Sequence, residues 1–250
     1  MDRDDYAVTK RFIDLSNQAD RKGIVLFSDF LNMNEINLLY KCKDAMPSTI
    51  ALYGGYDEAE RQMAAFQPDA LYYSWEFPIA CICFTPVRQK FAEDLSHRDV
   101  LGSLMHLGIE RSTIGDILLQ DDKVYIFCED KIKDFILQEL YKIRHTQVLG
   151  KTVNMTDFVV KHHYVEQHGV ISSNRLDAFV SLACKLSRAK ASEYILGENL
   201  FINGKLISNH NQKLSPGDIV SMRSFGKIRI DEIGDETKKG RIKVSFRWYQ

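Results

Sequence analysis

The sequence contains no Gly-x-Gly and no Cys-x-x-Cys motif, and no apolar run reaches the roughly 18 residues of a membrane-spanning helix. Without Gly-x-Gly, a dinucleotide-binding loop or a glycine-rich nucleotide loop of that type is excluded. Only 5 prolines and 14 glycines occur in 250 residues, which excludes a collagen-like or low-complexity chain. The first residues, 1–5, are acidic and lack the apolar stretch of a signal peptide. A cytoplasmic protein without a membrane span is therefore expected.

Metal-binding patterns are also scarce. The five cysteines have no framework spacing, which fits reduced thiols in a reducing compartment. Cys81 and Cys83 lie two residues apart in an apolar run, a pattern typical of core thiols. His162, His163 and His168 have no acidic or thiol partner at ligand spacing. Neither a metal site nor a cofactor is expected.

Two further patterns in the sequence resemble parts of enzyme sites. Gly150-Lys151-Thr152 imitates the end of a phosphate loop, but His145 occupies the position where that loop needs glycine. His97, Arg98 and Asp99 form the best remaining polar cluster. Helix capping by Asp99, or contact of Arg98 with an anionic partner, is favoured over catalysis there. No catalytic residue is predicted.

The residue composition is that of a folded protein, and its charges are unevenly distributed along the chain. Apolar residues make up 45% of the chain and charged residues 27%, enough to fill the cores of one large or two to three small domains. Residues 171–250 contain 14 Lys and Arg against 8 Asp and Glu, a net charge of +6. Residues 1–170 contain 19 against 26, a net charge of −7. This asymmetry suggests that the C-terminal part binds a polyanion, although a solvated basic surface would give the same count.

Three domains and an α+β fold class are predicted. Residues 1–74 are expected to be mainly helical, with cap candidates at 28–31 followed by Asn34-Glu35, a strand-like piece at 52–56 and a short helix at 58–66. Residues 75–165 are expected to form a β-α-β-β-α-β unit, the split βαβ arrangement found in ferredoxin-like and RRM-like domains. Its predicted elements are a buried strand at 79–84, a helix at 99–107, a hairpin around 121–122, a helix at 131–144 and a last strand at 157–160.

The small C-terminal domain, residues 170–250, begins after a boundary near 165–174. Ser172-Ser173-Asn174 is a dense set of N-cap residues, and two short helices are expected to follow, the second of them at 188–196 with Ser187 as its cap candidate. Asn203-Gly204 predicts a hairpin turn. The tail beyond residue 227 alternates apolar and basic residues, as in a hairpin. Its basic face could extend an RNA surface, and a solvated edge strand explains it equally well.

Four motifs in this last part carry a resemblance. They are Arg175-Leu176-Asp177, Ser187-Arg188-Ala189-Lys190-Ala191, Ile202-Asn203-Gly204-Lys205 and Leu214-Ser215-Pro216-Gly217-Asp218-Ile219. In this order and spacing they resemble the RNA-binding domain first seen in ribosomal protein S-four of the small subunit. Where related chains usually show Arg-Gly-Phe-Gly-Arg, this one has Arg223-Ser224-Phe225-Gly226-Lys227, so a point charge replaces a planar fork.

Motifs outside this domain extend the resemblance to nearly the whole chain. Together they resemble the bacterial YlmH family. The segments are Tyr53-Gly54-Gly55-Tyr56, Ala59-Glu60-Arg61, residues 97–109 and Ile114-Gly115-Asp116-Ile117.

Eight cations are the predicted RNA-binding residues, because Arg grips phosphate oxygens in bidentate fashion and Lys binds them as a compact charge. They are Arg175, Lys185, Arg188, Lys190, Lys205, Lys213, Arg223 and Lys227. Asp177 is expected to favour its helix N-terminus and to orient Arg175. Since stacking aromatics are scarce there, recognition of structured RNA by shape and backbone is expected.

The leading hypothesis is a non-enzymatic protein that binds ribosomal or transfer RNA. The resemblance implies a place on the large ribosomal subunit with its peptidyl-tRNA, in rescue of stalled translation, and an association with cell-division genes. A second hypothesis is an RNA-modifying enzyme with its active site in residues 1–165. A third is an adaptor whose acidic N-terminal part docks a protein.

Overall fold

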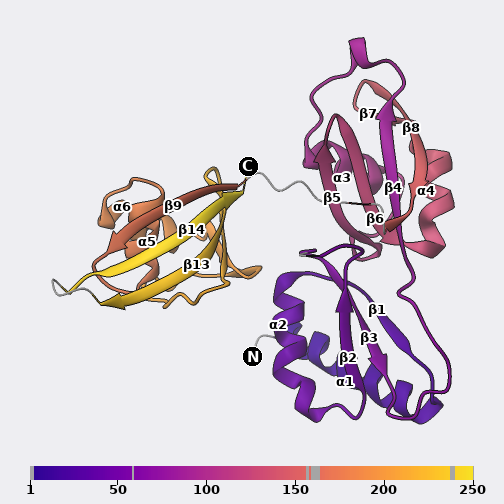
Figure 1. Ribbon diagram of the computed structural model, residues 1–250, viewed down its shortest axis with the longest axis horizontal. Helices are drawn as coiled ribbons and strands as arrows, with labels where there is room; N and C mark the ends of the chain where they lie inside the picture. Colours follow the sequence, from indigo (N-terminus) through magenta and orange to yellow (C-terminus); the bar gives the residue numbers. More distant parts are fainter. Residues whose placement is uncertain (1–2, 58, 156–157, 159–163, 237–239, 250) are drawn as a thin grey trace. The chain divides into compact units, whose positions relative to one another are not determined.

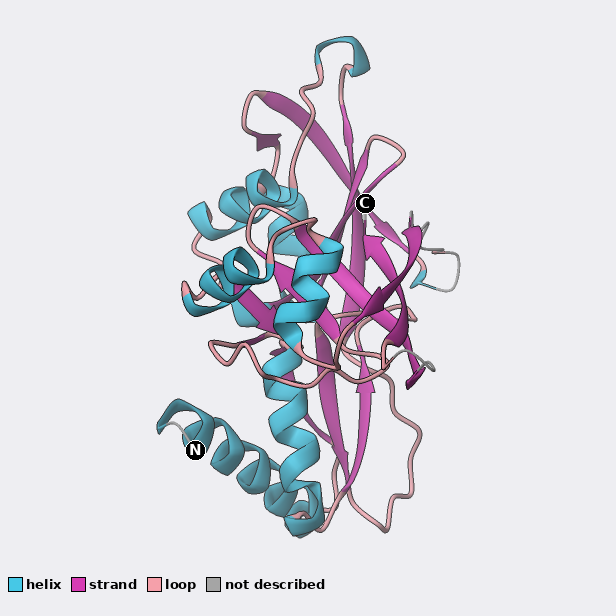
Figure 2. Cartoon of the chain, turned by 90° about the vertical axis from the view of Figure 1, so that its left-hand side faces the viewer, coloured by secondary structure: helices cyan, strands magenta, loops and turns pink. Residues whose placement is uncertain are grey.

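The computed structural model describes residues 3–57, 59–155, 158, 164–236 and 240–249. The chain divides into two compact units, Met1–Val160 and Lys161–Gln250, each described by itself below. Helices combine with three antiparallel sheets, so the predicted α+β class is confirmed (Figures 1 and 2). Within the described ranges, no helix is both long and apolar enough to cross a membrane.

The N-terminal third is not mainly helical as predicted, because it contains a three-stranded sheet of order β1-β3-β2. Two helices pack against this sheet through a core that includes Phe12, Leu39 and Phe66 (Figure 1). A short 3-10 turn, Lys43–Ala45, follows the second helix. The elements are α1 Arg3–Lys22, β1 Leu26–Leu31, α2 Met33–Cys42, β2 Thr49–Tyr53 and β3 Gln62–Gln67.

Strand β3 replaces the helix predicted over residues 58–66. Met63 to Phe66 are all buried, because β3 lies between β1 and β2 and its two faces enter different cores. Met and Ala are good helix formers, and burial on both faces overrides that preference. The cap of α2 is Asn32, one residue beyond the predicted segment 28–31, and it forms a capping box with Glu35, which is one of the predicted cap candidates.

The central part has the predicted split βαβ order. Four of its five strands run β5-β6-β4-β8 across the sheet, with β4 and β6 in the middle and β7 added beside β8. The hairpin turn lies at Asp121 and Asp122, both with positive φ. Short 3-10 turns lie at Gln89–Phe91, Arg111–Thr113 and Asp130–Ile132. The elements are β4 Ile79–Pro86, α3 His97–His106, β5 Ile114–Gln120, β6 Lys123–Glu129, α4 Lys133–Glu139, β7 Lys142–Ile143 and β8 Thr146–Val153.

Two predictions for this part are corrected or left open. The helix predicted over 131–144 is only α4, because the chain turns at Arg144 with positive φ and pairs β7 with β8. The last strand predicted at 157–160 lies outside the described residues except for Phe158, which is not in a strand. The fourth strand of the sheet is β8.

A buried network of hydrogen bonds joins the two domains that were predicted to meet between residues 74 and 75. The Asp116 carboxylate accepts hydrogen bonds from the Tyr56 hydroxyl at 2.7 Å and from the backbone N–H groups of Glu60 at 2.7 Å and Arg61 at 3.1 Å. The Arg61 side chain in turn donates to the carbonyl of Ile114 at 2.9 Å. Burial raises the pKa of Asp116, against the hydrogen bond from Tyr56. The YlmH-like motifs here thus hold the two sheets together.

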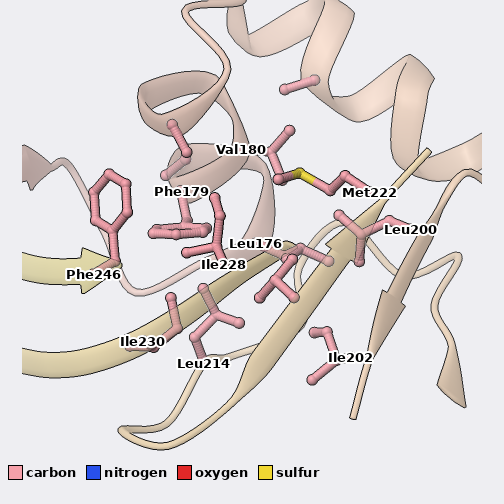
Figure 3. Close-up of a cluster of buried hydrophobic side chains, with 14 of the residues drawn as sticks. Leu176, Phe179, Val180, Leu200, Ile202, Leu214, Met222, Ile228, Ile230 and Phe246 are labelled. Atoms are coloured by element: carbon pink, nitrogen blue, oxygen red, sulfur yellow. The ribbon is translucent and has the colours of Figure 1, made fainter. Parts of the chain in front are cut away.

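The C-terminal unit is a six-stranded sheet of order β11-β10-β12-β13-β14-β9, with two helices against one face. Figure 3 shows its core, where Leu176 and Phe179 meet Ile228 and Phe246. Both predicted helices and the turn at Asn203-Gly204 are confirmed. The elements are β9 Tyr164–Ile171, α5 Leu176–Ala183, α6 Arg188–Leu196, β10 Leu200–Ile202, β11 Lys205–Leu206, β12 Ile219–Met222, β13 Gly226–Glu236 and β14 Ile242–Tyr249.

Sequence reasoning missed β9, which occupies the predicted boundary and pairs with β14 along its full length. Its side chains are mostly exposed on both faces, so no alternating pattern marks it as a strand.

Candidate RNA-binding surface

The start of α5 is held by a distant loop instead of by the predicted caps. The backbone N–H groups of Leu176 and Asp177 donate to the carbonyls of Gln212 at 2.8 Å and His210 at 3.1 Å. The side chain of Asn174 fastens the same loop, since it donates to the Leu214 carbonyl at 3.0 Å and accepts from its N–H at 3.1 Å. The segment that contains Lys213 is therefore fixed beside the start of α5.

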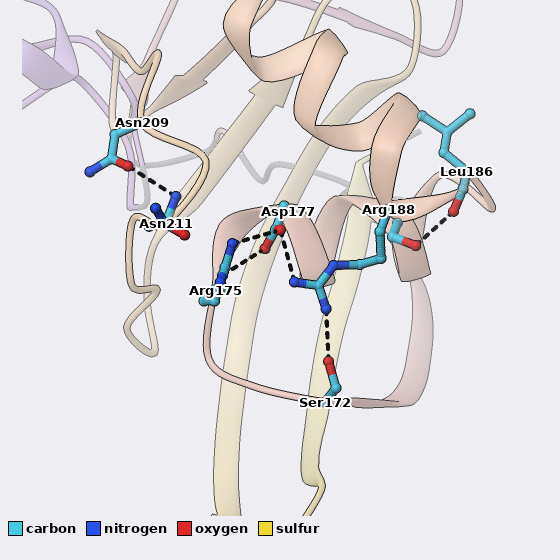
Figure 4. Close-up of polar contacts among 8 residues, drawn as sticks. Ser172, Arg175, Asp177, Leu186, Arg188, Asn209 and Asn211 are labelled. Atoms are coloured by element: carbon cyan, nitrogen blue, oxygen red, sulfur yellow. Dashed lines mark hydrogen bonds and ion pairs between the residues drawn. The ribbon is translucent and has the colours of Figure 1, made fainter.

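Two of the predicted arginines meet at one carboxylate (Figure 4). Arg175 donates Nε and Nη2 to the two oxygens of Asp177, at 3.2 and 3.0 Å. Arg188 donates Nη2 to Asp177 Oδ2 at 2.8 Å and Nη1 to the Ser172 hydroxyl at 2.8 Å. We call these three residues the arginine cluster: Arg175, Asp177 and Arg188.

Burial and charge decide what the arginine cluster presents to solvent. The Asp177 side chain is only 5% exposed, whereas those of Arg175 and Arg188 are 39% and 45% exposed. Burial pushes the pKa of Asp177 upward, but the hydrogen bonds from Arg188 and Arg175 prevail and lower it. The carboxylate stays ionised, so the cluster has a net charge of +1 and two outward guanidinium faces.

Four predicted lysines are exposed and form no ion pair with any residue that the structure describes. One of them, Lys185, has a positive φ of 54° at the turn between α5 and α6. Unpaired ammonium groups can approach phosphates without first breaking a salt bridge. The four are Lys185, Lys190, Lys205 and Lys213.

The last two predicted cations lie near aromatic rings on the sheet. The Arg223 guanidinium is 5.8 Å from the Phe201 ring, and the Lys227 ammonium is 5.7 Å from the Tyr249 ring. The hydroxyl of Tyr194 in α6 donates to the Arg223 carbonyl, which ties this loop to the helix pair. These rings and the Ser172 hydroxyl were not predicted as functional, because their positions depend on long-range pairing.

The basic face of the tail hairpin is partly neutralised. Arg247 forms a bidentate pair with Asp231, at 2.7 to 3.0 Å, and its guanidinium lies 4.9 Å from the Tyr164 ring. Arg229 is directly opposite Arg247 across β13 and β14. This face contains structural pairs as well as exposed cations.

The residues that resemble enzyme motifs cap a helix, fill a core or belong to a strand in the structure. Asp99 forms a capping box with Ser96 at the start of α3, as predicted. The Cys81 and Cys83 thiols are buried, and burial raises the pKa of Cys81 to about 12. His168 is exposed on β9, whereas His162 and His163 lie outside the described residues. Gly150 to Thr152 are part of strand β8 and form no phosphate loop.

Comparison with known proteins gives three matches. Residues 76–157 match the family model described as "Putative RNA-binding domain in YlmH". The chain is 26% identical to "Ribosome-associated protein quality control protein P2" of Bacillus subtilis (strain 168) over 247 residues, which cover 98% of this chain and 95% of that protein. The fold is similar to that of "Cell division protein ylmH from Streptococcus pneumoniae", at 20% identity and a TM-score of 0.53, over 64% of this chain and 97% of that one.

These matches confirm the resemblance to YlmH that the motifs indicated. The family-model match ends before the C-terminal unit, so the S-four resemblance stays a prediction.

Proposed function

We propose, on the premise that this chain carries the RNA-binding domain of the YlmH family, that it is a ribosome-associated RNA-binding protein. The name of the Bacillus subtilis relative, which places that protein on the ribosome in quality control, supports the ribosomal partner. The finer proposal is that unit 2 binds structured ribosomal or transfer RNA of the large subunit. The observation that carries it is the arginine cluster beside exposed lysines in a part of the chain with net charge +6.

We also propose that the protein acts without catalysis and in the cytoplasm. In unit 1 the buried carboxylate of Asp116 is fully engaged by Tyr56 and two backbone N–H groups, which favours a structural role. A cavity of about 470 Å³ in that unit is lined by four carboxylates and by Lys123, so its lining is acidic overall, which disfavours an RNA substrate inside the cavity. The four carboxylates belong to Glu93, Asp94, Asp121 and Asp122. A link to cell division belongs to the same proposal, prompted by the name of the pneumococcal protein.

Sedimentation with ribosomes through sucrose gradients tests this function. The wild type should migrate with the large subunit at low salt and leave it at high salt. If about 4–6 cations contact phosphates, log K should fall against log salt with a slope of about −3 to −5. Free protein at both salt concentrations would contradict the proposal.

A double variant tests the site itself. Arg175→Gln with Arg188→Gln removes both charges but keeps a donor beside the buried Asp177. We expect binding to weaken by about 30-fold or more, since each charge-assisted contact contributes about 1–2 kcal/mol. The matched control is Lys41→Ala with Lys43→Ala, two exposed cations of unit 1. Equal affinity of the folded double variant and the wild type would remove the arginine cluster from the site.

A further inference from the structure

The sheet of β4, β5, β6 and β8 has one face covered by helices and one face that the described residues cover only in part. Residues that alternate with the buried core of α3 and α4 lie on the second face, and cross-strand register aligns them in rows. We call the two rows nearest the 121–122 turn the open rows. The first contains Leu118, Tyr125, Cys83 and Lys151, and the second contains the next two pairs toward the turn, Gln120 with Lys123 and Thr85 with Leu149.

The row below the open rows is closed by the protein's own aromatic residues. Phe127 and Cys81 are fully buried there. The rings of Tyr56 and Phe158 lie 5.0 and 5.2 Å from the Phe127 ring. No nucleobase could reach that row without displacing them, so a ligand on this face is confined to the open rows.

Tyr125 is the aromatic ring of the open rows. It is half-buried, and its ring rests against Phe158 at 4.8 Å. A hydrogen bond also links its hydroxyl with the Cys83 thiol. Two contacts therefore fix the orientation of the ring, while part of its surface remains accessible. A fixed, accessible ring is a platform on which any base can stack.

The charges of the open rows differ from those of their surroundings. Residues 1–160 contain 18 Lys and Arg against 25 Asp and Glu, a net charge of −7. None of the eight residues of the open rows is acidic, and Lys123 and Lys151 are exposed there. Burial raises the pKa of Cys83, whereas the hydrogen bond with Tyr125 and the charges of Lys123 and Lys151 oppose that rise.

The adjoining hairpin tip is acidic, and its two aspartates directly precede Lys123 of the open rows. Asp122 accepts a hydrogen bond from the Gln89 amide at 3.1 Å. Asp121 lies beside it in the cavity described above. An anion that approaches from the β8 side meets Lys151 and the exposed Leu149 first.

We propose that the open rows bind an unpaired RNA strand, with a base stacked on Tyr125 and phosphates on Lys123 and Lys151. This site lies in unit 1, within residues 76–157, which match the family model described as a putative RNA-binding domain, and it rests on the proposed function in that the ligand is RNA. The flat sheet presents a ring to an exposed base face, which a paired strand does not provide.

Fluorescence anisotropy with the full chain and a labelled decamer of uridines tests this site. Lys123→Ala with Lys151→Ala should weaken decamer binding at least fivefold. The variant should also make the salt slope shallower by about 1.4, which is two phosphates at about 0.7 each for single strands. Lys41→Ala with Lys43→Ala removes the same charge elsewhere in unit 1 and should leave both quantities unchanged.

The ring is tested separately from the charge. Tyr125→Phe should retain decamer affinity within about twofold, whereas Tyr125→Leu should lose about tenfold or more. Urea unfolding of both variants shows whether the fold persists. If Tyr125→Leu unfolds unit 1, the decamer affinity and the salt slope of the Lys123→Ala, Lys151→Ala variant still test the site.

Three results would overturn the proposal. They are no decamer binding by the wild type, unchanged binding by the lysine variant, or equal binding of a decamer duplex. The ribosome gradient keeps the two sites apart, since the Arg175→Gln, Arg188→Gln variant should lose the large subunit but retain the decamer. If the wild type binds ribosomes but does not bind the decamer, only this second site is rejected.

Discussion

At the residue scale, Asp177 determines what its two arginine neighbours can present to a phosphate. It is almost fully buried, and it accepts three guanidinium N–H groups. These bonds fix both side chains before RNA arrives, so less rotamer entropy is lost on binding. They also cancel one of the two positive charges. Positioning and neutralisation therefore have opposite effects on affinity, and a single substitution can separate them.

Asp177→Asn should weaken binding to ribosomes about 5- to 10-fold, about 1–1.4 kcal/mol, if positioning dominates. An amide has only one acceptor oxygen, so its NH₂ group would face one of the guanidinium groups. Affinity measured by sedimentation at several salt concentrations checks this. Tighter binding of the variant would mean that Asp177 only neutralises charge.

The same carboxylate gives a pH dependence of stability. Its pKa is lowered on folding from the ordinary value of 3.8, so the folded state binds fewer protons in acid than the unfolded chain. The stabilisation is fully present above about pH 4 to 5 and is lost as the pH falls through the folded value. Urea unfolding of the wild type and of Asp177→Asn should differ at pH 7 and converge near pH 2. A constant difference across that range would contradict the assignment.

At the scale of elements, the sequence predicted those structures whose signal is local. The buried run at residues 79–84, the turn at Asp121 and Asp122, and the cap Ser187 of α6 all follow from neighbours in the chain. Strands β3 and β9 could not be predicted in this way. The first consists of helix-forming residues buried on both faces, and the second is polar and held by pairing with β14.

The candidate site, too, could be predicted from the sequence only where its signal is local. The eight cations were chosen from motif order, but the sharing of Asp177 by Arg175 and Arg188 joins residues eleven positions apart. The loop from His210 to Gln212 that caps α5 comes from more than thirty residues later. The spacing of residues along the chain does not predict such contacts.

Two glycines in unit 1 should respond in opposite directions to alanine. Gly55 has a φ of +101°, and a Cβ there would lie 2.3 Å from Phe127 Cδ1. We expect Gly55→Ala to lower the free energy of unfolding by about 2–4 kcal/mol. Gly102 lies in α3 with open space around it, so Gly102→Ala should raise stability by about 0.5–1 kcal/mol. Urea titrations followed by circular dichroism measure both, and a stabilising Gly55→Ala would refute the close packing of this turn.

At the scale of the whole molecule, two units of opposite charge share one chain. Residues 1–160 have a net charge of −7, and residues 161–250 have 15 Lys and Arg against 9 Asp and Glu, a net charge of +6. Each unit has hydrophobic clusters made only of its own residues. The near-neutral total therefore conceals one basic unit and one acidic unit.

Separate cores predict separate unfolding. Scanning calorimetry of the full chain should resolve two transitions. Gly55→Ala should lower the midpoint of only one of them, and Asp177→Asn that of only the other. If both variants moved one shared transition, the two units would be thermodynamically coupled.

The position of β14 has a consequence for biosynthesis. This strand lies between β13 and β9, although β9 is made first and ends 71 residues before β14 begins, at Ile171 and Ile242. During translation β9 therefore has no partner until the last strand leaves the ribosome, and closing the sheet waits for a contact of long sequence separation. A nascent unit 2 thus exposes the hydrogen-bonding edge of β9 until residues 242–249 have been made and have left the ribosome.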